Sequence, residues 1–110
     1  MSDCIFCKIA AGEFNTSLLY EDEQVIAFND INPEAPHHFL VIPRHHFVSV
    51  KEMTDELLMG HLLDVGNKVA GQLDLDSYRM VFNTGKQAGQ TVFHVHLHVL
   101  GGRSMNWPPG

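Results

Sequence analysis

Three histidines alternate with apolar residues in the segment 94–100, which reads HVHLHVL. In an extended strand, side chains point alternately to the two faces of the sheet. His94, His96 and His98 are therefore expected on one face, with successive rings about 6.6 Å apart, while the apolar residues between them face a core. A solvated, histidine-rich face and a metal site are the plainer interpretations. Because ionisable groups seldom cluster without a purpose, the pattern favours a catalytic or binding site.

The composition is that of an ordinary globular domain. The chain has 110 residues, 45% hydrophobic and 18% charged, which predicts a single domain over residues 1–110. A net charge of −6 argues against broad nucleic-acid binding, although one pocket can still accept a small phosphate-bearing ligand. We expect no membrane association, since no apolar run approaches the ~20 residues of a membrane span. The N-terminus does not resemble a signal peptide, so a cytoplasmic location is expected.

Hydrophobic periodicity and turn residues predict an α+β fold. The expected elements are a five-stranded, mostly antiparallel sheet, one long helix and one short helix. The strands are predicted at residues 18–20, 25–28, 39–42, 78–83 and 92–100, and the helices at 4–11 and 54–72. Thr54 is the expected N-cap of the long helix, because a hydroxyl can accept from the first free backbone N–H groups.

The histidine pattern is the signature of the histidine triad superfamily. Several other segments resemble its histidine triad nucleotide-binding protein branch, so that the resemblance covers nearly the whole chain. These segments are FNDINP (28–33), APHHFLVIP (35–43), YRMVFN (78–83), GQT (89–91), GGR (101–103) and WPPG (107–110). The Gly-Gly-Arg after the triad differs from the Pro-Arg that is typical of the dinucleoside polyphosphate hydrolase branch.

The resemblance implies a purine nucleoside phosphoramidase, which hydrolyses the P–N bond of nucleoside 5′-monophosphate amides such as adenosine phosphoramidates. His96 would attack phosphorus and form a nucleotidyl-histidine intermediate. A backbone carbonyl near His94 would fix the tautomer of His96. His98 would donate to a phosphate oxygen, and His38 would support the hydrogen bonds of the triad. His94, His96, His98 and His38 are the predicted catalytic set.

The resemblance also implies the residues that bind the nucleotide. Asp30 would accept from the ribose hydroxyls, but it could instead cap the turn before Pro33. The phosphate and leaving-group side would be formed by Asn83, Thr91, Gly89 and Gln90, and the apolar slot for the base by Phe6, Ile9, Phe28 and Ile31. Ile9 and Phe28 could equally be ordinary core residues.

Cys4 and Cys7 have the two-residue gap of a zinc half-site, which by itself is a weak signal. Some members of the superfamily use such a pair with two histidines, and the ligands implied here are Cys4, Cys7, His46 and His94. With four protein ligands the zinc would be structural, so no cofactor is required for catalysis. The alternative is a pair of reduced thiols without metal. No role is expected for the remaining histidines beyond surface exposure, namely His37, His45 and His61.

The resemblance further implies a homodimer with a continuous ten-stranded sheet. The long helix and the C-terminal tail would contribute to its interface, and Trp107 would lie near the active site of the other copy. Two alternatives to the phosphoramidase remain open at this point: a dinucleoside polyphosphate hydrolase and a nucleotide-binding regulatory or scaffold protein.

Overall fold

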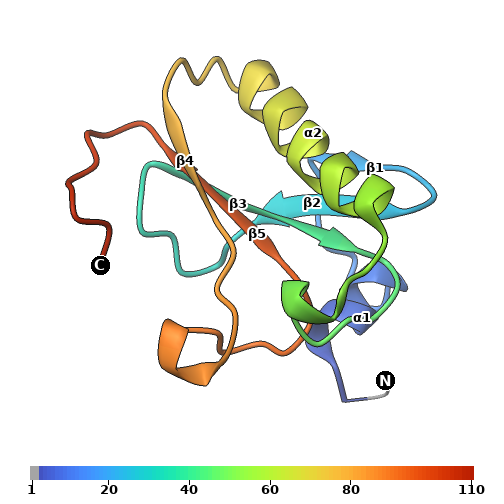
Figure 1. The fold of residues 1–110 in the computed structure, drawn as a ribbon. Helices are drawn as coiled ribbons and strands as arrows, with labels where there is room; N and C mark the ends of the chain where they lie inside the picture. The colour runs from blue at the N-terminus through green and yellow to red at the C-terminus, as the bar shows by residue number, and fades with distance from the viewer. Residues whose placement is uncertain (1–2) are drawn as a thin grey trace.

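The computed structural model describes residues 3–110; Met1 and Ser2, the first two residues of the expected domain, lie outside the described residues. Five strands form one sheet in the order β1-β2-β3-β5-β4, and every neighbouring pair is antiparallel. The strands are β1 (Tyr20–Glu21), β2 (Val25–Asn29), β3 (His37–Pro43), β4 (Tyr78–Val81) and β5 (Leu97–Gly101). The helices are α1 (Ile5–Ala10) and α2 (Glu56–Gln72), with short 3₁₀ turns at Val50–Glu52 and Lys86–Ala88. The predicted α+β class is confirmed (Figure 1).

The two faces of the sheet carry separate apolar cores. Alternate residues of β2 and β3 point to opposite faces, as the period of two in a strand requires. Ala27 and Val41 belong to the large core beneath α2, whereas Phe28 and Leu40 pack with Phe6 of α1 on the other face. The central strand β3 is therefore buried on both sides.

Helix α2 buries the stripe that its periodicity predicts, Leu58, Leu62, Val65 and Val69. The helix begins at Glu56, and its N-cap is Asp55, whose Oδ1 accepts from the Leu58 N–H at 3.0 Å. The prediction of Thr54 as the cap was therefore wrong by one residue, because both side chains can cap and Asp55 holds the position. Gly66 allows a close approach: a Cβ there would lie 2.8 Å from Cε of Met80.

The last strand is shorter than the sequence predicts. It begins at Leu97 rather than near Val92, because pairing with β3 starts only at the Val41–Leu97 pair. Before that point the backbone leaves the ladder, and the Val95 N–H donates to the Phe47 carbonyl in the loop after β3, at 2.8 Å. His94 and His96 therefore precede the regular strand, and their positions depend on this loop contact.

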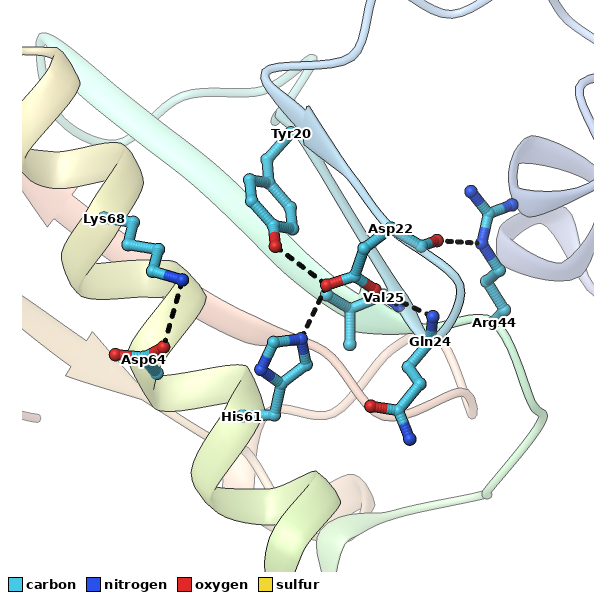
Figure 2. A network of polar contacts seen from close by, with 8 residues as sticks. All are labelled: Tyr20, Asp22, Gln24, Val25, Arg44, His61, Asp64 and Lys68. Atoms are coloured by element: carbon cyan, nitrogen blue, oxygen red, sulfur yellow. Dashed lines mark hydrogen bonds and ion pairs between the residues drawn. The ribbon is translucent and has the colours of Figure 1, made fainter.

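The turn between β1 and β2 is fixed by Asp22. Its Oδ1 accepts from the backbone N–H groups of Gln24 (2.7 Å) and Val25 (2.8 Å). Its Oδ2 accepts from the Tyr20 hydroxyl at 2.8 Å and lies 2.6 Å from Nε2 of His61 on α2 (Figure 2). The expectation of simple surface exposure for His61 was wrong, since its side chain is only 25% exposed.

Burial by itself would raise the pKa of the Asp22 carboxyl. The hydrogen bonds from His61, from the two backbone N–H groups and from Tyr20 outweigh burial and hold that pKa below its usual range. The ionised carboxylate thus ties the turn to α2.

Within residues 3–110, no helix has both the length and the hydropathy of a membrane span.

Candidate functional site

The histidine face of the sheet opens on a cavity beside α1. His96 and His98 both line this cavity, whose volume is about 400 Å³, within the range of ligand pockets. Their ring centroids are 4.8 Å apart, closer than the spacing expected from the backbone rise, because the two rings tilt toward each other. The residues between the histidines, Val95, Leu97 and Val99, are buried in the core beneath α2, as predicted.

His96 presents one nitrogen to the cavity and hides the other. Its Nδ1 lies 2.7 Å from the His94 carbonyl oxygen. Because a carbonyl only accepts, Nδ1 carries the proton and Nε2 keeps its lone pair. Burial lowers the pKa of His96, while the bond to the carbonyl and the charge of Asp30 oppose that shift. The acceptor expected near His94 is in place, and the ring is neutral at neutral pH.

A chain of hydrogen bonds fixes the tautomer of His98. The Glu34 backbone N–H donates to Nδ1 of His38 at 3.0 Å, so the proton of neutral His38 is on Nε2. That Nε2–H donates to Nδ1 of His98 at 2.9 Å, which leaves the Nε2–H of His98 free to donate elsewhere. Burial, followed by the neighbouring His96 and His38, lowers the pKa of His98 to about 4, so the ring is neutral at pH 7. His38 therefore makes the supporting contact that was expected of it.

Asp30 uses its two oxygens differently. Oδ1 accepts from the Asn32 N–H at 2.8 Å, which is the turn-capping role that the sequence left open. Oδ2 lies 3.4 Å from Nε2 of His38, and the residue also lines the cavity. The cap therefore orients the carboxylate without occupying both of its oxygens.

The cavity contains all four residues that were expected to bind the base. The predicted residues that line it, besides His96 and His98, are Phe6, Ile9, Phe28, Asp30, Ile31 and Thr91. Further lining residues that sequence reasoning missed are Ile5, Phe14, Thr16, Asn29, Asn32, Leu40 and Val92. Phe14 is an aromatic in a polar stretch and remains 53% exposed, a signal that could have identified it. The lining of this cavity includes Asp30 but neither Lys nor Arg.

Other predicted residues lie outside the cavity. Gln90 is buried and holds its loop together: Nε2 donates to the Val48 carbonyl at 2.6 Å, and Oε1 accepts from the Gly85 N–H at 2.8 Å. Asn83 and Trp107 line a separate hollow beside β4, where Trp107 is 82% exposed. Gly89, with a positive φ, packs near the Asn83 side chain and does not line the cavity either.

The ring of His94 is directed to a second cluster. It is fully buried; its Nε2 lies 2.8 Å from the Pro43 carbonyl oxygen, and its Nδ1 lies 3.3 Å from Sγ of Cys4 and 3.5 Å from Sγ of Cys7. Sγ of Cys7 also lies 3.4 Å from Nδ1 of His46. Burial raises the pKa of the Cys7 thiol, so a metal would have to displace its proton.

The donor atoms of this cluster fit a tetrahedral metal. All four lie within 4.8 Å of one another. Ordinary Zn–S and Zn–N bond lengths at a tetrahedral angle separate sulfur from nitrogen by about 3.5 Å, close to the 3.3–3.5 Å found between the thiols and the imidazoles. The fold thus gathers the ligand set that the resemblance implies, and Nε2 of His94 already has the backbone acceptor typical of a metal-bound histidine.

Comparison with known proteins places this geometry in a family. The family model of the HIT domain matches residues 11–105. An uncharacterised HIT-like protein of Synechocystis sp. is 47% identical over 98% of this chain and 97% of its own length. A solved HIT family hydrolase from Legionella pneumophila is 44% identical, with a TM-score of 0.94 over 98% of this chain and 100% of its own. A histidine triad protein from Clostridium difficile is 42% identical, with a TM-score of 0.91 over 96% of both chains.

Proposed function

The chain belongs to the histidine triad (HIT) family, and we propose that it hydrolyses the P–N bond of purine nucleoside 5′-monophosphate amides, as the nucleotide-binding branch does. One observation carries the proposal. The 2.7 Å bond from Nδ1 of His96 to the His94 carbonyl leaves an unprotonated Nε2 in a cavity that also holds a carboxylate and an apolar slot. An uncharged imidazole with one lone pair directed at a ligand cavity is suited to nucleophilic attack on phosphorus.

Different residues of the cavity would bind the base, the ribose and the phosphoryl group of such a substrate. Phe6, Phe28 and Ile9 offer an apolar slot for the purine, and the Phe6 and Phe28 rings meet edge to face at a centroid distance of 5.7 Å. Asp30, oriented by its contact with Asn32, would accept from the ribose hydroxyls. The phosphoryl group would then lie beside His96 and His98.

In the first step, the lone pair of His96 Nε2 forms a bond to phosphorus while the P–N bond of the substrate breaks. The amine leaves with the electron pair of that bond and takes up a proton from water. The Nε2–H of His98 donates to a phosphate oxygen whose negative charge grows in the transition state. Nδ1–H of His96 stays bonded to the His94 carbonyl, which stabilises the positive charge that develops on the ring.

In the second step, water attacks the phosphorus of the nucleotidyl-imidazole. The P–Nε2 bond breaks, its electron pair returns to His96, and the water loses a proton to solvent. The products are the nucleoside monophosphate and the free enzyme. Thr91, whose side chain borders the cavity, would offer its hydroxyl to the leaving group or the incoming water.

The charge of the cavity favours a monophosphate amide over a dinucleoside polyphosphate. A long phosphate chain carries several negative charges and needs cations to offset them. Among the residues that line the described cavity there is neither Lys nor Arg, and Asp30 adds a negative charge. A substrate with one phosphoryl group suits this lining better.

The test is turnover of adenosine 5′-phosphoramidate beside a dinucleoside tetraphosphate, with mass spectrometry of the quenched enzyme. We expect the amide to be the preferred substrate and the nucleotidyl group to be found on His96. His96→Ala should abolish turnover, while His45→Gln, at an exposed imidazole outside the cavity, should retain it. Preferred cleavage of the tetraphosphate would establish the competing hydrolase. An inactive wild-type protein that still binds adenosine monophosphate would establish the regulatory or scaffold alternative.

We also propose that the Cys4–Cys7–His46–His94 cluster holds a structural zinc ion. Both thiols are free of disulfides, which agrees with a reducing, cytoplasmic setting. Bound zinc would join α1 to the loop after β3, and it would take no part in the chemical steps. Metal analysis of the purified protein, with Cys7→Ser as the control, should find one zinc per chain in the wild type and much less in the variant.

A homodimer is proposed from the open edge of the sheet. Strand β4 lies at the edge, and its residues are only half-buried in the single chain. Such an edge is a template for pairing with a second copy, which would give a ten-stranded sheet. Leu63 is one helical turn from Asn67, which accepts from the Tyr78 hydroxyl of β4, so Leu63 lies on the β4 side of α2.

Two matched leucines test this interface. Leu63 is 41% exposed on the β4 side, whereas Leu57, 87% exposed, is one turn from His61 and so lies on the β1 side. Sedimentation should find a dimer in the wild type and in Leu57→Asp, and a weakened dimer in Leu63→Asp. Dissociation by both variants or by neither would argue against the β4 edge as the interface.

A further inference from the structure

His94 belongs to two clusters at once. Its backbone carbonyl oxygen accepts a hydrogen bond from Nδ1 of His96 at 2.7 Å, and this bond sets the tautomer of His96. Its ring, fully buried, is held between the Pro43 carbonyl at 2.8 Å and the thiols of Cys4 and Cys7 at 3.3 and 3.5 Å. The anchored ring and the acceptor on which the nucleophile depends therefore belong to one residue, so contacts that hold the ring also restrict the position of its backbone.

Phe6 makes a second connection between the same clusters. It lies between the two cysteines in sequence, on the first turn of α1, and is 7% exposed. Its ring meets the ring of His94 at a centroid distance of 5.9 Å and that of His96 at 5.1 Å, both edge to face. The helical turn that carries the thiols thus also carries the aromatic ring packed against the nucleophile.

Helix α1 depends on external contacts for its position. It has six residues, which is too short for stability on its own. Sγ of Cys4 caps its N-terminus by accepting from the Cys7 N–H at 3.3 Å, and Arg44 donates to the Ala10 carbonyl at 2.9 Å at the other end. Sulfur hydrogen bonds are weak, so a metal bound by both thiols would add a much stronger polar contact at the N-terminal end than the Cys4 cap provides.

We propose that the Cys4–Cys7–His46–His94 cluster is a positioning site for the nucleophile: metal bound there holds His94 and Phe6, and through them the orientation of His96. This inference rests on the proposed function only for its effect on turnover. Cys4 and His46 also line a surface hollow of about 560 Å³ that is shared with Val48 and Phe93. The cluster is therefore open to the exchange of metal from a side that His96 does not line.

His46→Gln is the sharpest variant for a test. It removes one donor from the loop after β3 and leaves the thiols, α1 and His94 unchanged. The matched control is His45→Gln, because His45 is the neighbouring exposed imidazole and contributes no atom to the cluster. Wild-type protein stripped of metal by a chelator, and then reloaded with Zn²⁺, provides a comparison that involves no substitution.

Four quantities are measured on these samples. They are zinc content, the ¹⁵N shifts of the His96 ring at one fixed pH, and kcat beside the Kd for adenosine monophosphate. We expect His46→Gln and stripped protein to lose the shift pattern of a pure Nδ1–H tautomer and to lose kcat by roughly 10-fold or more. The Kd should change little, and Zn²⁺ should restore the stripped protein.

Unchanged ¹⁵N shifts of the His96 ring in metal-free, folded protein would overturn the proposal. The cluster would then only attach α1 to the rest of the fold. A protein that contains no zinc and takes none up would overturn it as well. The nuclear magnetic resonance readout needs no substrate. A failure of phosphoramidate turnover in the wild type would therefore count against the proposed function and not against this coupling.

Discussion

Two histidine–aspartate contacts lie at different places in the sheet and have different consequences. In one, Nε2 of His61 on α2 lies 2.6 Å from Asp22 in the β1–β2 turn (Figure 2). In the other, Nε2 of His38 on β3 lies 3.4 Å from Asp30 beside the cavity. From the sequence alone the two pairs look alike, and neither is adjacent in the chain.

The difference lies in what the remaining atoms contact. Both oxygens of Asp22 are used, with contacts to Tyr20, Gln24, Val25 and His61, so the group has little capacity left for a ligand. Asp30 makes one short bond and lines the cavity, and the Nε2–H of His38 donates to Nδ1 of His98. A pair whose polar atoms all have hydrogen-bond partners is a structural contact. A pair at a cavity that can still form hydrogen bonds is a candidate for catalysis or ligand binding.

The largest expected contrast is between His98 and His61. His98→Ala removes the Nε2–H donor and should lower kcat for an adenosine phosphoramidate by about 100- to 1,000-fold. His61→Ala should leave kcat unchanged and lower the free energy of unfolding by about 1–2 kcal/mol. Steady-state turnover and urea unfolding of both variants measure the contrast. A large loss of turnover in His61→Ala would remove the distinction between the two pairs.

The two aspartates should also differ: substitution of Asp22 should mainly lower stability, and substitution of Asp30 should mainly raise KM. Asp22→Ala loses several bonds to an ionised carboxylate and should lower the free energy of unfolding by about 2 kcal/mol, with KM unchanged. Asp30→Ala loses one short bond in its turn and the longer contact with His38, and it should cost less than about 1 kcal/mol, but it should raise KM about 10-fold. Equal effects on KM would show that Asp30 does not bind the ribose.

The histidine network beside the cavity and the Asp22 turn should also lose their contributions to stability in different pH ranges. The pKa of His98 is about 4 in the fold, against 6.5 when unperturbed, so the unfolded chain binds its proton first. The stability that depends on neutral His98 is complete above about pH 6.5 and is lost as the pH falls toward 4.

The pKa of Asp22 is lowered instead, so its contribution is complete above about pH 4 and is lost below that value. Unfolding free energies between about pH 3 and pH 8 test this separation. His98→Asn should flatten the upper part of the profile, and Asp22→Asn the lower part. A wild-type profile that is level from pH 6.5 to 4 would contradict the neutral state assigned to His98.

The smallest effect is expected at the C-terminal tail, whose Trp107 lines a hollow beside β4. Deletion of residues 107–110 removes Trp107, which is 82% exposed, so folding should be nearly unchanged. If Trp107 contacts the leaving group in the other copy of a dimer, the relative kcat/KM for two different amines should change a few-fold. Loss of cooperative unfolding on deletion would instead assign the tail to the fold.

The histidine pattern correctly predicted which side chains lie on each face of the sheet, because a local rule governs their placement. Alternation in an extended segment places His96 and His98 at the cavity and Val95, Leu97 and Val99 in the core, even though the regular ladder starts only at Leu97. The extent of the strand and the role of His61 were predicted wrongly. Both depend on contacts between segments far apart in sequence, namely the Phe47 carbonyl and the β1–β2 turn.

The sequence by itself determined the fold class, the core stripe of α2 and the identity of the histidine cluster, since periodicity and residue type are local properties of the chain. The acceptor of His96 was already implied by the resemblance, but only the tertiary structure decided which nitrogen of His38, His94 and His98 is free. That choice depends on acceptors and donors brought from elsewhere: the Glu34 N–H for His38, and the Pro43 carbonyl for His94. Protonation in a buried site is set by neighbours in space, because burial and hydrogen bonds, not sequence position, determine which tautomer is stable.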